Sequence, residues 1–464
     1  MKLTTQSQQL MSSMMENECI PIQVKTKTLH HQSLLTKQVC LQYYHDLQEA
    51  AAKTTQISIT NKSSKQITQR SDIIKSHTFH DMAFPDGVIS HIDTHSKLEK
   101  TYLFSLFDKP IKVHFILEED IKNEIMEQYI QAIQMWLLMV HKYASKECFD
   151  ELIILFYFTS LKKTLPDDDH HPNNPHNPHN HTSPIILNRI HINTAFTTSC
   201  PKKAEIIVFR KEEWFKVFLH ESFHTFGLDF SSMDTRVCDQ AILSIFQVPI
   251  EDPRLYESYC EFWAEITNAM FCSYFAMKKT KETKETKHNK DSTTFLKYTT
   301  YFIQFERNYS LLQLVKALNY MNLTYENLFS LTFKDKTKRE ALYKEKTSVL
   351  SYYIIKTILM NYYEAFIHWC HVNNTSNTNN RRNTSNTNKH NVLSLLQFKN
   401  TTTNLKSFCE FIQQHYRTNE MLTNVKSAEE CYKTLLLTKR NKNVNEEDLT
   451  LLLKNLRMTI CELG

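Results

Sequence analysis

Glycine is the residue that this chain most lacks: it has three glycines among 464 residues, against a usual share of about 7%. Together with an excess of Asn, Lys, Thr and Ile, this scarcity suggests an AT-biased genome. It says nothing about chemistry. One of the three glycines, Gly227, lies in the most informative segment of the chain.

Long apolar runs are also absent. No stretch of about 20 apolar residues occurs, so we expect no membrane-spanning helix. The first 23 residues are polar and are interrupted by Glu16, Glu18 and Pro21, so they lack the apolar run of a secretory signal. The 11 cysteines are odd in number and scattered without close pairs, which suits a reducing compartment better than a disulfide framework. These features predict an intracellular protein.

Neither sign of charge dominates the composition. The chain has 55 basic and 50 acidic residues, for a formal net charge of +5. This balance gives no specific indication of nucleic-acid binding. Hydrophobic residues make up 41% of the chain, enough to bury a sizeable core.

Composition divides the chain into three regions. Residues 1–78 are polar with little periodicity, and we expect a poorly ordered or peripheral extension. Residues 79–280 carry alternating strand and helix patterns, interrupted at 166–183 by a His/Pro/Asn-rich loop. Residues 281–464 are mainly helical, with a flexible Asn/Thr-rich insertion at 373–391.

The element order within the second region predicts an α+β fold. Strands are expected at 102–107, 112–117, 152–158, 189–194 and 205–209, and helices at 119–145 and 211–226. A further helix should begin at Asp252 and Pro253, an N-cap side chain followed by a first-turn proline, and run to about residue 275.

The expected helix at 211–226 contains His220, Glu221 and His224, followed by Gly227. Residues four apart lie above one another on a helix, so both imidazoles can bind one zinc ion. Glu221 lies about 100° around the axis, where its carboxylate reaches a water molecule rather than the metal. Gly227 can adopt the left-handed conformation that ends a helix.

Two histidines leave zinc short of protein donors, because catalytic sites normally have three. The helix expected from Asp252 offers three carboxylates at four-residue steps, Glu257, Glu261 and Glu265. Such a stripe is also what a solvated helix face looks like, but a cation would remove the repulsion among its members. Spacing alone leaves the choice between Glu257 and Glu261 open.

The histidine pair and this acidic helix together resemble zincin metallopeptidases of the gluzincin type. More narrowly, residues 210–219 running into the histidine pair resemble uncharacterised zincin-like proteins of giant DNA viruses, which would place the protein in host cytoplasm or a virion. The resemblance implies a zincin-like core with one Zn²⁺ per chain. It implies that Glu261 is the third ligand and that Glu265 orients a ligand histidine.

On this resemblance the expected activity is hydrolysis of peptide bonds, with Glu221 as general base. The strand at 189–194 would lie at the sheet edge above the metal, where an extended peptide substrate can pair with it. Candidate oxyanion donors are Tyr256, Tyr259 and His191. The alternative is a catalytically inert structural or virion-associated protein that retains a zincin fold. No membrane partner is expected, and the oligomeric state is left open.

Overall fold

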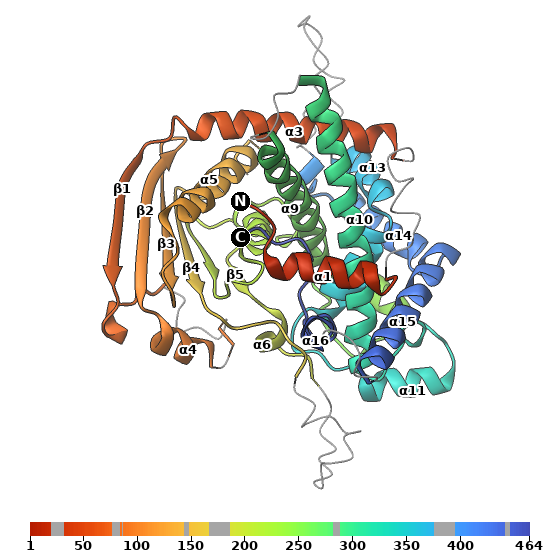
Figure 1. Cartoon of the computed structure of the whole chain (residues 1–464). Helices are drawn as coiled ribbons and strands as arrows, with labels where there is room; N and C mark the ends of the chain where they lie inside the picture. Colours follow the sequence, from red (N-terminus) through yellow and green to blue (C-terminus); the bar gives the residue numbers. More distant parts are fainter. Residues whose placement is uncertain are drawn as a thin grey trace, which may run out of the picture.

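A six-stranded mixed sheet lies on one side of the molecule and a body of helices on the other (Figure 1). The computed structural model describes residues 1–19, 32–76, 84–85, 87–142, 148–166, 186–281, 288–374, 395–440 and 446–464. The expected loop at 166–183 and the insertion at 373–391 fall almost wholly outside these residues.

The strand order in the sheet is β1-β2-β3-β4-β6-β5. Strand bounds are β1 Ile59–Gln66, β2 Leu98–Leu106, β3 Lys109–Leu117, β4 Glu151–Phe158, β5 Ala195–Thr197 and β6 Lys203–Val208. The central pairs β3–β4 and β4–β6 are parallel, whereas β1–β2, β2–β3 and β5–β6 are antiparallel. The short strand β5 therefore forms one edge of the sheet and runs against its neighbour.

Helices supply most of the rest of the described chain. The longer ones are α1 Thr5–Glu16, α3 Leu34–Thr54, α4 Val88–His95, α5 Asn123–Val140, α7 Trp214–Thr225, α8 Arg236–Ile245, α9 Leu255–Lys281, α10 His288–Tyr320, α11 Phe333–Leu342, α13 Tyr363–Asn374, α14 Thr402–His415, α15 Asn419–Arg440 and α16 Glu446–Lys454. A π-helical turn, η5 Leu350–Ile355, leads into α12 Lys356–Asn361. No helix in the described part of the chain is long and apolar enough to cross a bilayer.

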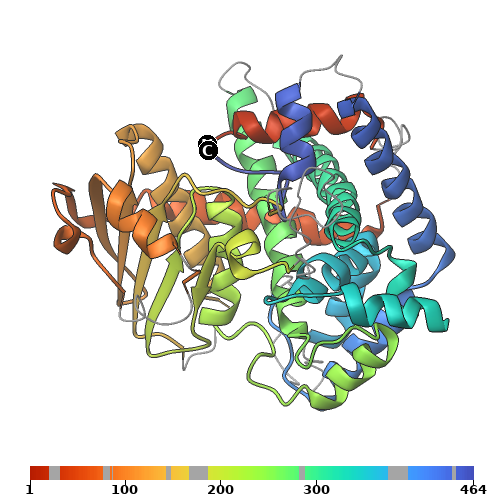
Figure 2. The same ribbon diagram turned by 90° about the horizontal axis from the view of Figure 1, so that it is seen from below.

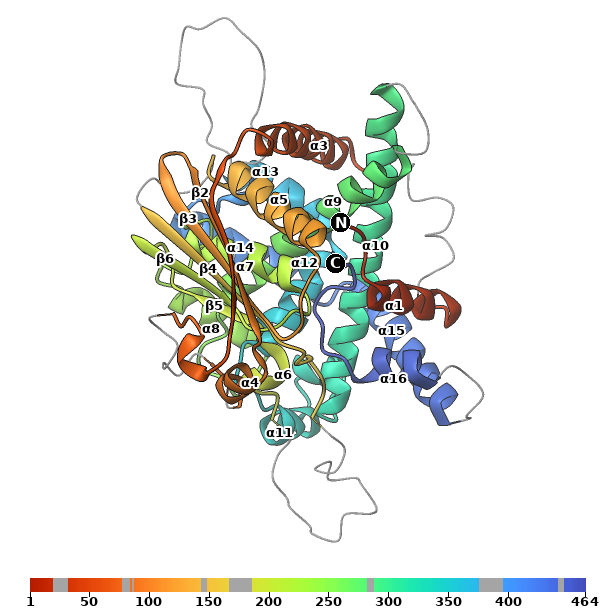
Figure 3. The same cartoon turned by 60° about the vertical axis from the view of Figure 1, so that its left-hand side comes forward.

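The two faces of the sheet pack against different partners. One face packs on α5 and α7 through aromatic contacts such as Phe115 with Tyr129 and Phe156 with Trp214. The other face is covered by α4 and Phe84 in a smaller apolar cluster. Figure 2 shows the sheet and the helical body side by side. Helix α9 packs on α7 and α10 packs on α9, and both lie to the right of α7 in Figure 3. Helix α7 thus lies between the sheet and the helical body.

The expected α+β fold is confirmed at the level of a mixed α/β architecture, with a six-stranded mixed sheet and many helices. The strands expected at 102–107, 112–117, 152–158 and 205–209 correspond to β2, β3, β4 and β6. The helices expected at 119–145 and 211–226 correspond to α5 and α7, each shorter than predicted.

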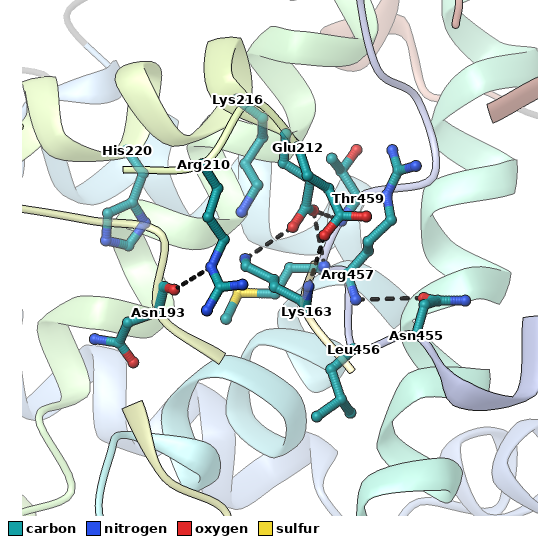
Figure 4. Close-up of polar contacts among 12 residues, drawn as sticks. Lys163, Asn193, Arg210, Glu212, Lys216, His220, Asn455, Leu456, Arg457 and Thr459 are labelled. Carbon is teal, nitrogen blue, oxygen red and sulfur yellow. Dashed lines mark hydrogen bonds and ion pairs between the residues drawn. The ribbon is translucent and has the colours of Figure 1, made fainter. Parts of the chain in front are cut away.

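The strand expected at 189–194 is wrong. Residues Arg189–Ile192 form a single helical turn, α6, and the edge strand begins at Ala195. The buried guanidinium of Arg210 explains the difference, because it donates to the carbonyl oxygens of Ile190 and Asn193. The segment in which Ile190 and Ile192 alternate with polar residues is therefore a helical turn held by Arg210, not a strand. Figure 4 shows the hydrogen bond between Arg210 and Asn193.

The amino-terminal region is not the peripheral extension that its composition predicted. Helix α3 buries Val39, Tyr43 and Leu47 in the main core, and the Tyr43 hydroxyl lies 2.8 Å from that of Thr267 on α9. Helix α1 adds Leu10 and Met14. The prediction from composition is wrong because only one face of α1 and one face of α3 are apolar, so polar residues dominate the composition of this region. Every residue of β1 is exposed.

Four cysteines form disulfides, Cys19–Cys431 and Cys148–Cys200. Both link positions far apart in sequence, a pairing that the scattered spacing of the cysteines did not predict. Seven other cysteines in the described chain are free and buried. The scattered spacing of cysteines therefore gives no support for a reducing compartment.

A carboxyl-terminal segment following α16 lies against the start of α7 (Figure 4). The Oε1 atom of Glu213 accepts hydrogen bonds from the backbone N–H groups of Met458 and Thr459, at 2.8 and 2.6 Å. Its Oε2 atom lies 2.8 Å from Nζ of Lys163. These contacts fix the first turn of α7 from outside the helix, which positions the histidines two turns later.

Candidate metal centre

Helix α7 presents its histidines from a rigid, buried frame. It is preceded by Glu213 in a left-handed conformation with φ 59° and followed by Gly227 at φ 64°. The amide of Gly227 donates to the carbonyl oxygen of His224 at 3.1 Å, as expected for a glycine that ends a helix. Every residue from Trp214 to Thr225 is buried.

The two imidazoles converge with the carboxylate of Glu257 in the first turn of α9. The Nε2 atoms of His220 and His224 are 3.3 Å apart, and Oε2 of Glu257 lies 3.0 Å from the first and 3.5 Å from the second. All three side chains belong to residues that are 5–8% exposed, so the cluster is buried yet reachable from the surface.

This triangle fits zinc. Donors about 2.0–2.1 Å from a tetrahedral ion are separated from one another by about 3.3 Å. The three measured separations, 3.0, 3.3 and 3.5 Å, bracket that value. Two imidazole nitrogens and one carboxylate oxygen are also a usual donor set for a catalytic zinc. His220, His224 and Glu257 are therefore the residues that would hold the ion.

The rear nitrogen of each imidazole faces a carboxylate. Nδ1 of His220 lies 2.8 Å from Oε2 of Glu261, a contact too bent for a well-directed hydrogen bond. Nδ1 of His224 contacts Oδ2 of Asp229 closely. Such carboxylates keep the proton on Nδ1 and leave Nε2 available to a metal. The buried Lys216 ammonium donates to the other oxygen of Glu261 and balances its charge.

The electrostatics of the cluster favour ionised groups. Burial alone would raise the pKa of Glu257, but hydrogen bonds from His220 and His224 hold it well below its usual value. Burial likewise opposes protonation of His220, yet its carboxylate partners Glu257 and Glu261 raise its pKa to about 9. A metal cation that replaced the protons on the two imidazoles would bind where neighbouring carboxylates already stabilise positive charge.

Glu221 lies on the same turn of α7 and borders both cavities next to the cluster. Burial raises the pKa of its carboxyl above the usual value, while the neighbouring imidazoles oppose that rise. It is not among the three residues whose donor atoms converge. This is the placement expected of a proton acceptor beside a metal.

A cleft of about 280 Å³ opens beside the cluster. Its walls include Ala195, Phe196 and Thr197 of β5 and Tyr352 of η5. A smaller cavity of about 30 Å³ is lined by residues that include His220, Lys216 and Met458. Glu221 and Tyr352 border both spaces, so they lie where the two meet.

The expected roles of two glutamates on α9 are corrected by this geometry. Glu261 faces Nδ1 of His220 rather than the paired Nε2 atoms, and Glu257 takes the place expected for Glu261. Glu265 contacts neither histidine, since its Oε1 lies 2.6 Å from Nζ of Lys356. Because α9 crosses α7, glutamates on successive turns of α9 face different atoms.

The three expected oxyanion donors lie in different parts of the structure, and one of them borders the cleft. Tyr256 borders the cleft and its ring lies 5.8 Å from that of His224. The Tyr259 hydroxyl is buried elsewhere, where it donates to the carbonyl oxygens of Leu395 and Leu396. His191 Nδ1 accepts from the backbone of Asn188 and borders neither cavity.

Tyr352 was not predicted from the sequence. Its ring lies 6.1 Å from that of His220, and its hydroxyl interacts with Glu257. It is 95 residues beyond Glu257 in the chain, in a π-helical turn that no local pattern predicted. The contact of Asp229 with Nδ1 of His224 was not predicted either. Its spacing of five residues from His224 was the available signal.

Comparisons with known proteins add no family. No family model, no curated protein and no solved structure matches the chain.

Proposed function

We propose that the protein is a zinc-dependent metallopeptidase with a zincin-like core. The observation that carries this proposal is the convergence of the two Nε2 atoms and Oε2 of Glu257 at separations suited to one tetrahedral ion. The carboxylates behind both imidazoles add to it, because carboxylate partners of ligand histidines are usual at zinc sites.

Zinc bound by these residues would acidify a water molecule and polarise the carbonyl group of a substrate. Glu221 then accepts the proton of the attacking water and returns it to the leaving amine. Its buried position beside the ligands supports this role. No acidic side chains other than Glu221 and Glu257 border the cleft among the described residues.

Tyr352 is the best-placed donor for the developing oxyanion. Burial raises the pKa of its hydroxyl well above the usual value, so it stays protonated and able to donate. It borders both the cleft and the smaller cavity, as Glu221 does. A donor fixed in a water-poor site stabilises negative charge more strongly than water does.

Strand β5 would orient the substrate. It is the terminal strand of the sheet, and within the described residues no other strand pairs with its outer edge. An extended peptide can add to such an edge and place its carbonyl groups over the cleft. The end of β5 nearest α6 is fixed by the bond from Arg210 to Asn193.

Two measurements test the proposal. Zinc per chain is measured by elemental analysis, and cleavage of a mixed peptide library is followed by mass spectrometry for the wild type and for Glu221→Gln. We expect one zinc in both proteins and cleavage only by the wild type. One zinc without cleavage by the wild type would favour an inert protein that keeps a zincin-like site, and no zinc would reject both.

A further inference from the structure

The cleft beside the metal centre carries an unusual distribution of charge. Two arginines border it, Arg189 at the start of α6 and Arg254 just before α9. The acidic side chains on its wall, Glu221 and Glu257, both belong to the proposed metal centre. Two carboxylates balance the charge of one divalent ion, so neither of them is left over to neutralise the arginines.

Arg254 is held at the rim by its backbone. Its φ of 48° is left-handed, a conformation that non-glycine residues rarely adopt. The Ser351 hydroxyl bonds to the carbonyl oxygens of Pro253 and Arg254, at 2.6 and 3.0 Å. This contact ties the position of Arg254 to Tyr352, the next residue along η5. Strained residues held in this way concentrate at functional sites.

The side chain of Arg254 remains able to exchange partners. Its Nε atom lies 3.4 Å from Oδ2 of Asp252, and the two side chains are 45% and 63% exposed. Exposed ion pairs of this kind contribute little to stability, so a substrate carboxylate can replace Asp252 at small cost. A guanidinium can bind a carboxylate through two parallel hydrogen bonds, which also fixes its orientation.

We infer that the cleft selects peptides with an acidic side chain close to the scissile bond, bound by Arg254 and assisted by Arg189. This inference rests on the proposed peptidase function for the position of the bond that is cut. It adds the substrate class, since the cleft that β5 lines is also lined by Arg189 of α6 and by Arg254 just before α9. Peptides with lysine at the same position are rejected by like charge.

The test uses three peptides that differ at one position near the cut site, with Glu, Gln or Lys. For the wild type we expect kcat/KM for the Glu peptide to exceed that of the Gln peptide about 10-fold or more, a preference that weakens at high salt. The ratio should fall towards one in Arg254→Gln and in part in Arg189→Gln. Arg254→Glu should prefer the Lys peptide. Arg236→Gln, at an exposed site outside the cleft, is the matched control.

Binding separates this inference from the proposed function. Fluorescence anisotropy of the same peptides is measured with zinc-loaded Glu221→Gln, alone and combined with Arg254→Gln. Tighter binding of the Glu peptide that is lost with Arg254→Gln supports the inference even if the wild type cleaves nothing, an outcome that would reject the peptidase. Equal binding and equal cleavage of the Glu and Gln peptides would overturn the inference and leave the peptidase standing.

Discussion

The backbone N–H of Cys200 donates to the carbonyl oxygen of His224 across 3.0 Å. Cys200 lies in the connection between β5 and β6 and is disulfide-bonded to Cys148, just before β4. The hydroxyls of Thr197 and Thr225 are also 3.0 Å apart. The β5–β6 hairpin is thus tied to the end of the helix that carries the imidazoles, and the disulfide anchors that hairpin to the sheet.

Replacing both Cys148 and Cys200 by serine should therefore affect catalysis as well as stability. Loss of the cross-link frees a loop of about 50 residues in the unfolded chain, which costs about 4 kcal/mol of stability in the chain-entropy model. We expect kcat/KM to fall because β5 is less firmly held, while zinc content stays at one. Urea unfolding and peptide cleavage measure the two effects.

The matched control is Cys19→Ser with Cys431→Ser, which removes the disulfide between the segment after α1 and α15. It should lower stability with little change in kcat/KM. Alkylation under denaturing, non-reducing conditions should label seven of the 11 cysteines in the wild type. Labelling of all 11 would contradict the pairing, and equal losses of kcat/KM in the two variants would contradict the role of the hairpin.

Exchanging the glutamates of α9 for glutamine distinguishes a metal ligand from the carboxylate behind a ligand. Glu257→Gln should abolish stable zinc binding, because a neutral amide is a poor substitute for a carboxylate donor. Glu261→Gln should weaken zinc affinity about 10- to 100-fold, the usual effect of removing a partner of a ligand histidine. Competition with a chromophoric chelator measures both. A larger loss in Glu261→Gln than in Glu257→Gln would restore Glu261 as the ligand.

The sequence predicted the helix that carries the imidazoles and a later helix that carries the acidic partner, because both depend on local spacing. It did not distinguish Glu257 from Glu261, since that choice depends on how α9 crosses α7. Tyr352 was missed for the same reason, because its place beside His220 is a tertiary contact. The strand expected at 189–194 does not form. The side chain of Arg210, distant in sequence, donates to carbonyl oxygens that a strand would use to pair with its neighbour.

Tyr352→Phe tests the proposed oxyanion donor with the smallest change. The ring keeps its packing, and only the hydroxyl is lost. We expect kcat to fall about 100-fold with KM changed little, because the hydroxyl contributes most where charge develops. Tyr256→Phe, on the wall of the same cleft, should change kcat less than about threefold. Comparable losses in both variants would mean that Tyr352 has no special role, and unchanged zinc content in both would exclude an effect through the metal.

The carboxyl of Glu345 predicts a pH dependence of stability near the site. Its Oε2 atom accepts from the Tyr343 hydroxyl at 2.6 Å and from the backbone N–H of Leu350, the first residue of η5, at 3.0 Å. Burial raises its pKa to about 7. Between its unfolded value of about 4.3 and pH 7, the folded chain holds a proton that the unfolded chain has lost, so stability falls as the pH rises.

With allowance for the partial exposure of Glu345, this group should remove about 2 kcal/mol of stability between pH 5 and pH 8. Glu345→Gln cannot ionise, so its free energy of unfolding should decline less over the same range. Urea unfolding at four pH values compares the two proteins, with Glu340→Gln, an exposed site on α11, as the control. Parallel pH profiles for wild type and Glu345→Gln would show that Glu345 is already ionised at pH 5. In that case the start of η5, and with it Tyr352, would be held by a charged carboxylate throughout this pH range.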